Sequence, residues 1–337
     1  MSSPLVPKGA TPARVMSRRP CFYSAGADPA RDRPAYVRAG SGCAFIDVPG
    51  QGRRLAIVQD DASFIALVDD ISGRVDAVEL PEAPGAVRQF EKARGNKMDK
   101  LDLEACTAIE VAGRPALLAI GSGSVAVRET FVLLRFDDDG RPVVDMLPAP
   151  AFFARLREHR AFSGSELNVE GMVLLADGSL RLFNRGNGAP DECGGPVNAH
   201  GDVPLDGLLT WLHDPSASMP QLTGVTPHQL GSVRGVSLTF TDATACADGI
   251  VFLASAEDSP NAIDDGAVVG TAIGLMRLDG SIAMAPIHDE EGQPLTDKIE
   301  GVAIDPARPD RALVVVDRDD PVQPCELLVV TLPTRWG

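Results

Sequence analysis

Three glutamates recur at matching points of the chain, each followed by Gly or Ala and then by apolar residues. They are Glu104, Glu170 and Glu300, and Ser41 and Thr244 open two further segments of the same form. Carboxylates that converge on one point repel one another unless a cation or protons neutralise them. Calcium, which accepts oxygen ligands in loose geometry, is the natural counter-ion, and magnesium is the tighter alternative. The other interpretation is that these polar residues only hydrate a channel, because carboxylates are cheap to hydrate and costly to bury.

A second set of polar residues follows these segments. Each segment leads into a β-rich apolar run, and the run stops at a polar cluster. The clusters supply Asp60, Asn184, Arg185, Asp258, Asp317 and Arg318. Because neighbouring strands of a meander are antiparallel, the start of the first strand and the end of the second lie at the same end of the sheet. We therefore expect the clusters to surround the glutamates.

Basic residues accompany both sets. Arg185 and Arg318 occupy the same place in two copies, and Lys97, Lys100 and Lys298 precede the glutamates. Guanidinium and ammonium groups of this kind bind anionic substrates. The alternative is that they pair with the surrounding acids. The predicted substrate-binding residues are Arg185, Arg318, Lys100, Lys298, Asp60 and Asp258.

A repeated structural unit must position these side chains. Alternating apolar residues and Asp/Gly turns predict strands, and third strands are expected at residues 64–73, 131–140, 208–215 and 273–280. Repetition of a four-stranded unit is typical of a β-propeller. We therefore predict an all-β fold, a β-propeller of five four-stranded blades, with six blades as the alternative.

The fifth copy ends one strand short. We predict that a strand within residues 13–24 pairs with the last blade and closes the ring, because closure removes exposed strand edges. This divides the chain into an N-terminal segment, 1–40, and a single propeller domain, 41–337. Residues 149–160 are predicted to be helical, and residues 187–206 to form a long Gly/Pro-rich loop.

The Glu-Gly pairs carry a resemblance to known families. Asn168-Val-Glu-Gly and Lys298-Ile-Glu-Gly, with the looser Asp102-Leu-Glu-Ala, resemble the phytase-like propellers and are similar to the gluconolactonase/regucalcin group, whose members usually have six blades. In those families a glutamate at the channel mouth helps to bind a divalent metal. The resemblance implies metal-facing roles for Glu104, Glu170 and Glu300, with Asn184 and Asp317 as further ligands. Metal-activated water attacking a phosphoester or a lactone would be the chemistry.

Two functions follow from this pattern. One is a divalent-metal-dependent hydrolase of a small anionic ester at the channel mouth. The other is a non-catalytic propeller that binds a ligand or a protein partner, since a fold alone does not determine function. A hydrolase should keep its carboxylates in an open, wet funnel, whereas a scaffold would pair them with Arg185 and Arg318.

Composition limits the partners and the compartment. A net charge of −16 disfavours nucleic acid, and no run of residues approaches a membrane span or a signal-peptide core. The six cysteines contain no Cys-x-x-Cys pair, which argues against structural zinc and a disulfide framework. We therefore expect a cytoplasmic protein with mostly buried thiols. Among the histidines only His200, near Asp202, is retained as a possible acid or base.

Overall fold

A computed structural model describes residues 10–192, 194–259 and 266–336. Three of its sheets are four-stranded antiparallel meanders in chain order. The first contains β2 (Gly40–Val48), β3 (Gly52–Gln59), β4 (Phe64–Val68) and β5 (Val75–Glu79). The second contains β6 (Leu103–Val111), β7 (Arg114–Gly121), β8 (Thr130–Phe136) and β9 (Pro142–Pro148). The third contains β10 (Val169–Leu174), β11 (Ser179–Asn184), β12 (Asn198–Pro204) and β13 (Thr223–His228).

The fourth sheet has nine strands, in the order β14-β15-β16-β17-β18-β1-β21-β20-β19. One half contains β14 (Ser232–Val233), β15 (Val236–Cys246), β16 (Gly249–Asp258), β17 (Ala267–Arg277) and β18 (Ile282–His288). The other half contains β19 (Lys298–Ile304), β20 (Arg311–Asp317), β21 (Glu326–Thr331) and β1 (Ala13–Pro20). Parallel pairing of β1 with β18 joins the two halves, so the five sequence copies do not appear as five separate four-stranded sheets.

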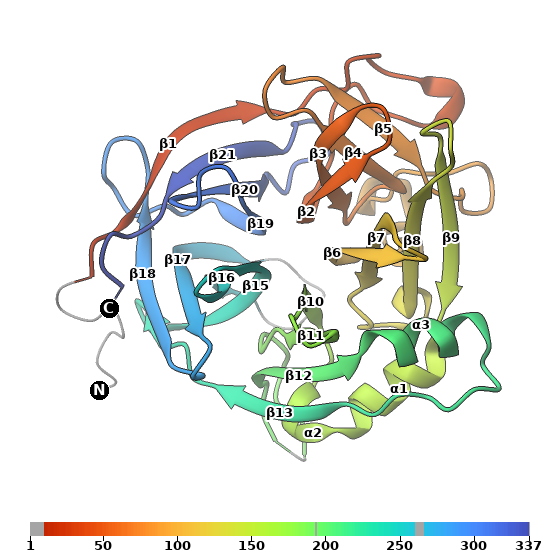
Figure 1. The fold of residues 1–337 in the computed structure, drawn as a ribbon. Helices are drawn as coiled ribbons and strands as arrows, with labels where there is room; N and C mark the ends of the chain where they lie inside the picture. Colours follow the sequence, from red (N-terminus) through yellow and green to blue (C-terminus); the bar gives the residue numbers. More distant parts are fainter. Residues whose placement is uncertain (1–9, 193, 260–265, 337) are drawn as a thin grey trace.

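The sheets are arranged around a central axis, with β2, β6, β10, β15 and β19 nearest to it (Figure 1). Each of these inner strands contacts the next, and β19 contacts β2, so the circle is closed. The prediction of an all-β fold is confirmed, and the circular arrangement is that of a propeller. Residues 55–58 of β3 are completely buried, because neighbouring sheets cover both faces of this sheet.

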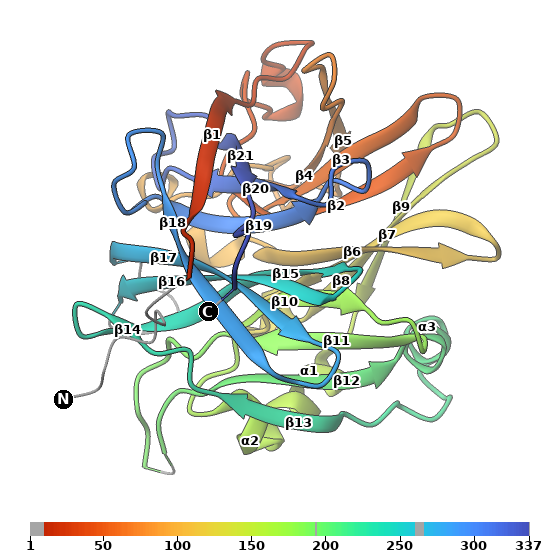
Figure 2. The same ribbon diagram turned by 60° about the vertical axis from the view of Figure 1, so that its left-hand side comes forward.

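An N-terminal strand completes the last sheet, as predicted. β1 pairs antiparallel with β21, from Arg14 opposite Thr331 to Pro20 opposite Glu326, and it lies between β18 and β21 (Figure 2). Its side chains alternate between buried and exposed over residues 13–16, with Ala13 buried and Arg14 exposed. The division into segments 1–40 and 41–337 remains a prediction.

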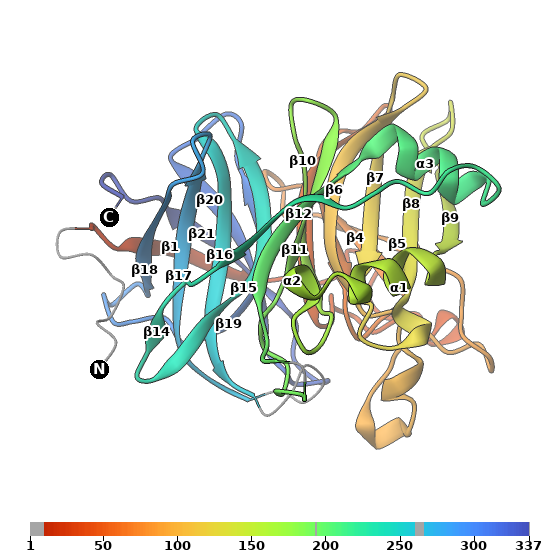
Figure 3. The same cartoon turned by 90° about the horizontal axis from the view of Figure 1, so that it is seen from below.

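Helices cover the outside of the second and third sheets (Figure 3). They are α1 (Pro150–Glu158), α2 (Arg160–Ser163) and α3 (Leu205–His213), and short 3-10 turns lie at Pro29–Arg31, Lys92–Arg94, Lys97–Asp99 and Ala126–Arg128. α2 packs on β12 and β13, and α3 packs on β9 and β12. None of the helices in the described residues is long and apolar enough to cross a bilayer.

Two of the local predictions need correction. The helix expected at 149–160 is present as α1. The strand expected at 208–215 is wrong, because most of these residues belong to the helix α3. Leu205, Leu208 and Leu212 are all buried, and their spacing places them on one helical face. The third strand of this sheet is instead β12, which lies inside the predicted loop 187–206.

Candidate functional site

All five inner strands carry a β-bulge at the same place. The register shifts between Gly40 and Cys43, Leu103 and Ala105, Val169 and Gly171, Phe240 and Asp242, and Ile299 and Gly301. A bulge takes its extra residue out of the ladder and changes the direction of that side chain. Glu104, Glu170 and Glu300 are such extra residues, so the three glutamates occupy one structural position. Ser41 lies within the corresponding shift of β2.

The prediction that Thr244 belongs to this set is wrong. Thr241 lies at the bulge of β15, whereas Thr244 pairs with Val251 farther along the strand. Asp242 then stands where the other strands have Gly or Ala. Its carboxylate is completely buried and accepts a hydrogen bond from Val302 N at 2.8 Å.

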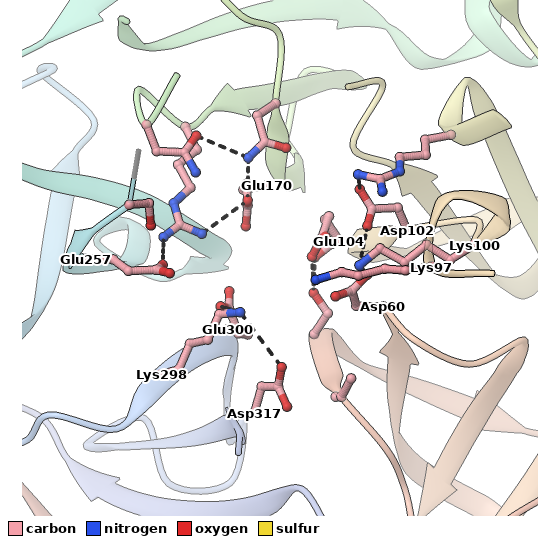
Figure 4. Close-up of a pocket in the computed structure, with 18 residues that line it drawn as sticks. Asp60, Lys97, Lys100, Asp102, Glu104, Glu170, Glu257, Lys298, Glu300 and Asp317 are labelled. Carbon is pink, nitrogen blue, oxygen red and sulfur yellow. Dashed lines mark hydrogen bonds and ion pairs between the residues drawn. The ribbon is translucent and has the colours of Figure 1, made fainter. Parts of the chain in front are cut away.

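Four of the five bulges, those of β2, β6, β10 and β19, border a polar cavity of about 40 Å³ at one end of the channel (Figure 4). Seven carboxylates line it: Asp60, Asp102, Glu104, Glu170, Glu257, Glu300 and Asp317. Five cationic side chains line it as well: Lys97, Lys100, Arg128, Arg185 and Lys298. With every group ionised, the lining carries two negative charges in excess.

Lys100 lies at the centre of one acidic group. Its Nζ is 2.8 Å from Asp102 Oδ1 and 3.2 Å from Asp61 Oδ1, and it also pairs with Asp60. Arg128 Nη1 lies 2.8 Å from Asp102 Oδ2. Burial alone would raise the pKa of Asp102, but these two cations hold it well below its usual range. Burial and the neighbouring acids raise the pKa of Asp60.

Arg185 neutralises a second group. Its Nη1 lies 3.3 Å from Glu170 Oε1, and its Nη2 pairs with Glu257. Glu170 Oε1 also accepts a hydrogen bond from Asn168 Nδ2 at 2.7 Å. The other oxygen, Glu170 Oε2, is buried without a hydrogen-bond partner among the described residues. Burial raises the pKa of Glu170 despite the charge of Arg185.

Lys298 is the cation of a third acidic group. Its Nζ lies 2.9 Å from Asp319 Oδ1, 3.7 Å from Glu300 Oε1 and 3.9 Å from Asp317 Oδ2. Glu300 Oε2 is a second buried oxygen with no hydrogen-bond partner in the described part of the chain. Burial raises the pKa of Glu300 well above its usual range and that of Asp317 to about 7.

Oxygen donors for a hard cation are present. One ligand atom each from Asp60, Asp102 and Glu104 lie within 4.8 Å of one another, and this is the one group of three possible ligands found in the described residues. Ser41 Oγ donates to Glu104 Oε2 at 2.5 Å. Carboxylate oxygens are the ligands that calcium and magnesium prefer, so the lining fits such an ion. Burial and the nearby carboxylates raise the pKa of Glu104.

The cavity contains most of the predicted site residues, but three lie outside its lining. Asn184 is completely buried: its side chain accepts from Asn168 N at 2.8 Å and donates to Val197 O at 2.9 Å. Arg318 pairs with Asp297 at 2.7 Å. Asp258 is exposed.

Six polar lining residues were not predicted: Asp102, Arg128, Asn168, Asn187, Glu257 and Ser259. Asp102 and Asn168 each stand two positions before a predicted glutamate, and this spacing was available in the sequence. A register shift in the pairing of β16 with β17, between Ala256 and Glu257, separates Glu257 from the preceding ladder. No sequence signal marks that shift.

His200 is not part of this site. Its Nδ1 lies 2.7 Å from Nε2 of His228, and burial lowers its pKa to about 4. Asp202, the expected neighbour, forms a two-point ion pair with Arg181 at 2.7 and 2.8 Å. The two histidines lie on β12 and β13, and neither of them lines the cavity.

Sequence comparison assigns the chain to a family. The profile described as "Family of unknown function (DUF6929)" matches residues 36–332. The chain belongs to this family. No curated protein matches this DUF6929 member.

Solved structures similar to this DUF6929 protein have low sequence identity. The PQQ-bound aldose sugar dehydrogenase from Streptomyces coelicolor matches with a TM-score of 0.44 and 12% identity, over 98% of this chain and 99% of that chain. The calcium-binding protein regucalcin from Agrobacterium tumefaciens matches with 0.40 and 12%, over 96% and 95%. A putative gluconolactonase matches with 0.33 and 10%, over 86% and 74%. Similarity at this level carries no inference about activity or ligand, and the phytase-like resemblance stays a prediction.

Proposed function

We propose that this protein is a divalent-metal-dependent hydrolase of a small ester, with its active site in the polar cavity of a five-bladed propeller whose last two blades share one sheet. Calcium is the proposed ion and magnesium the alternative. One observation carries the proposal. Two buried carboxylate oxygens, Glu170 Oε2 and Glu300 Oε2, have no hydrogen-bond partner among the described residues, and they line the same cavity as the Asp60, Asp102 and Glu104 group.

The charge of the cavity supports a dication. Leaving a buried carboxylate oxygen unpaired costs free energy, and a metal ion or a proton removes that cost. The excess of two negative charges in the lining matches one divalent ion. Because burial raises the pKa of Glu104, Glu170 and Glu300, part of this charge is held as protons when no metal is bound. Metal binding should therefore release protons.

The residues of this chain would divide the work of hydrolysis. A bound divalent ion would polarise an ester oxygen and lower the pKa of a bound water. Glu170, Glu300 and the Asp60, Asp102 and Glu104 group would hold it. Asp317, with a pKa of about 7, is suited to accept a proton from the attacking water at neutral pH.

A larger groove adjoins the cavity and could hold the substrate. It has a volume of about 420 Å³ and shares Ala39, Lys97 and Asp317 with the cavity. Arg38, Lys92 and Lys97 supply positive charge to the groove. Its five carboxylates, Asp61, Glu91, Asp317, Asp319 and Asp320, outnumber these cations. This balance favours an ester with little negative charge, such as a lactone, over a phosphoester.

A second candidate function is a non-catalytic binding propeller. The observation that favours it is the pairing of Arg185 with Glu170 and Glu257, and of Lys100 with Asp60 and Asp102, which neutralises acids without any ligand. A scaffold of this kind would bind a small molecule or a protein partner. The absence of nucleic-acid and membrane partners and the cytoplasmic location remain predictions.

Calorimetric titration with calcium and magnesium, followed by assays on a panel of lactones and phosphomonoesters, tests both candidates. The hydrolase proposal expects calcium binding near 1:1, proton release on binding, and metal-dependent lactone hydrolysis that Asp317→Asn reduces at least tenfold. Asp258→Asn changes an exposed carboxylate outside the lining and is the matched control. It should leave calcium binding and lactone hydrolysis unchanged. Metal binding without hydrolysis of any ester would favour the scaffold. A wild-type protein that binds neither ion would refute the proposal.

A further inference from the structure

Two cysteines from opposite ends of the chain meet where the ring closes. Cys21 directly follows β1, and Cys325 directly precedes β21. Pro20 is paired with Glu326 in the antiparallel register, so Cys21 and Cys325 are the next residues opposite one another. Cys21 N donates a hydrogen bond to Cys325 O at 3.0 Å.

Their side chains share one environment. Cys21 is 2% exposed, Cys325 is 1% exposed, and both belong to the same apolar cluster. Opposite residues of an antiparallel pair point to the same face, with Cα atoms about 4.5–5.5 Å apart. Disulfides span Cα separations of about 4.4–6.8 Å. A hydrogen bond from Cys325 lowers the pKa of the Cys21 thiol, and the same contact raises that of Cys325.

We propose that Cys21 and Cys325 are a redox-active pair. Exchange with a low-molecular-weight disulfide such as oxidised glutathione joins the two thiols in a Cys21–Cys325 disulfide, which closes the propeller ring covalently. The Cys21 thiolate attacks one sulfur of oxidised glutathione and releases one glutathione. Cys325 then attacks the Cys21 sulfur of the mixed disulfide and releases the second. Two protein thiols lose two electrons, and one oxidised glutathione becomes two reduced molecules that take up the two protons.

The position of the pair explains why such a bond would matter. Val37 N donates to Cys21 O and Cys325 N donates to Val37 O, both at 2.9 Å, so three chain segments join at this point. The strand β2, which carries Ser41 of the cavity, begins three residues after Val37. A cross-link here would enclose nearly the whole chain in one loop. Disulfides that close long loops restrict the unfolded chain most strongly, so the oxidised protein should resist unfolding.

Peptide mapping tests the pairing directly. The native full-length protein is incubated with oxidised or reduced glutathione, alkylated in denaturant, and digested with trypsin without reduction. Tryptic peptides 19–31 and 319–335 each contain a single cysteine. We expect them to be linked in the oxidised sample and separated by dithiothreitol. The oxidised wild type should melt several degrees above the reduced protein.

Serine variants provide the controls. Cys21→Ser and Cys325→Ser should each lose both the linked peptide and the oxidation-dependent rise in melting temperature. Cys246→Ser, at a half-buried cysteine at the end of the inner strand β15, should keep both the linked peptide and the rise in melting temperature. The proposal is refuted if both thiols are found alkylated in the sample treated with oxidised glutathione. It is also refuted if Cys21 carries only glutathione, or if the cross-link joins a different cysteine. None of these outcomes depends on metal binding or hydrolysis.

Discussion

At the scale of single residues, the cavity holds more acid than its cations neutralise. Asp317 and Glu300 share one lysine, Lys298, which lies 3.7 Å or more from each of them and closer to Asp319. Because the positive charge of Lys298 offsets only part of the effect of burial, burial raises the pKa values of both carboxyl groups. Asp102, held between Lys100 and Arg128, is the opposite case. The backbone is also strained there, since Asp102 adopts a left-handed φ of 54°.

The first residue-scale prediction concerns pH. Asp317 keeps its proton in the folded protein up to a pKa of about 7, whereas in the unfolded chain it loses its proton near the usual aspartate pKa of 3.8. Between these values the folded state binds more protons, so the free energy of unfolding falls as pH rises, by up to ~1.4 kcal/mol per pH unit for one such group. Metal-free protein should therefore melt lower at pH 7.5 than at pH 5. Thermal melts in chelator measure this slope.

Asp317→Asn should reduce the slope, because the amide does not titrate, whereas the other buried acids of the cavity retain part of it. Asp258→Asn, an exposed site, should keep it. Equal slopes in wild type and Asp317→Asn would show that Asp317 does not titrate in this range.

The second residue-scale prediction separates the two glutamates that have an unpaired oxygen. Glu300 pairs only loosely with Lys298, so Glu300→Gln should leave the metal-free protein as stable as the wild type, or more so. Glu170 is a partner of the buried Arg185, so Glu170→Gln should cost ~1–3 kcal/mol by leaving that guanidinium undercompensated. Both variants should lose most of the thermal stabilisation by calcium. Urea unfolding and calcium-dependent melting measure the two effects, and equal stability losses would contradict this account.

At the scale of elements, the bulges of the inner strands decide where the acids point. At these bulges the backbones of neighbouring inner strands lie very close to one another. A Cβ on Gly301 would lie 2.2 Å from Ser41 O, and a Cβ on Gly42 would lie 2.6 Å from Glu104 O. These glycines therefore let each strand pass close to its neighbour beside the cavity.

The element-scale prediction follows from this contact. Gly301→Ala should destabilise the protein by ~1–3 kcal/mol, because backbone atoms of two inner strands must separate. Gly207→Ala in α3 is the control: its nearest neighbour would be 3.6 Å away, and alanine favours a helix, so stability should be unchanged or higher. Urea unfolding compares the two. A Gly301→Ala protein as stable as the wild type would show that the strands adapt without cost.

At the scale of the whole molecule, one strand from the start of the chain completes the circle. β1 fills the edge beside β21 and also touches β18, so it joins the fourth and fifth sequence copies. Arg18 adds ion pairs to Glu290, Asp297 and Glu326 at 3.1–3.3 Å. Without this strand, both edges would be exposed and able to pair with other molecules.

Truncation tests the closure. Deleting residues 1–24 should lower the melting temperature by many degrees or cause aggregation. Deleting residues 1–9 leaves β1 intact and should change little. Thermal melts with light scattering measure both outcomes. A 1–24 deletion that melts like the wild type would show that the ring is stable without β1.

The sequence by itself determined the repeat, the column of Glu104, Glu170 and Glu300, and the need for an N-terminal closing strand. Each of these follows from local periodicity or from counting strands, which requires no knowledge of distant contacts. Only the tertiary structure placed Thr241 rather than Thr244 at the fourth bulge, because residues 241–246 offer Thr at both positions and pairing with β16 selects one. A shift of one residue turns a side chain to the opposite face of a strand, so register can be settled only by the partner strand.

The pairing of charges was also decided by tertiary structure. Arg185 and Arg318 stand at matching points of the repeat, yet Arg185 enters the cavity and binds Glu170, whereas Arg318 binds Asp297 outside it. Repeat equivalence fixes the strand and the end at which a side chain lies. The carboxylate that it reaches depends on neighbouring sheets and on distances of a few ångströms across the channel, and these arise only when the ring closes.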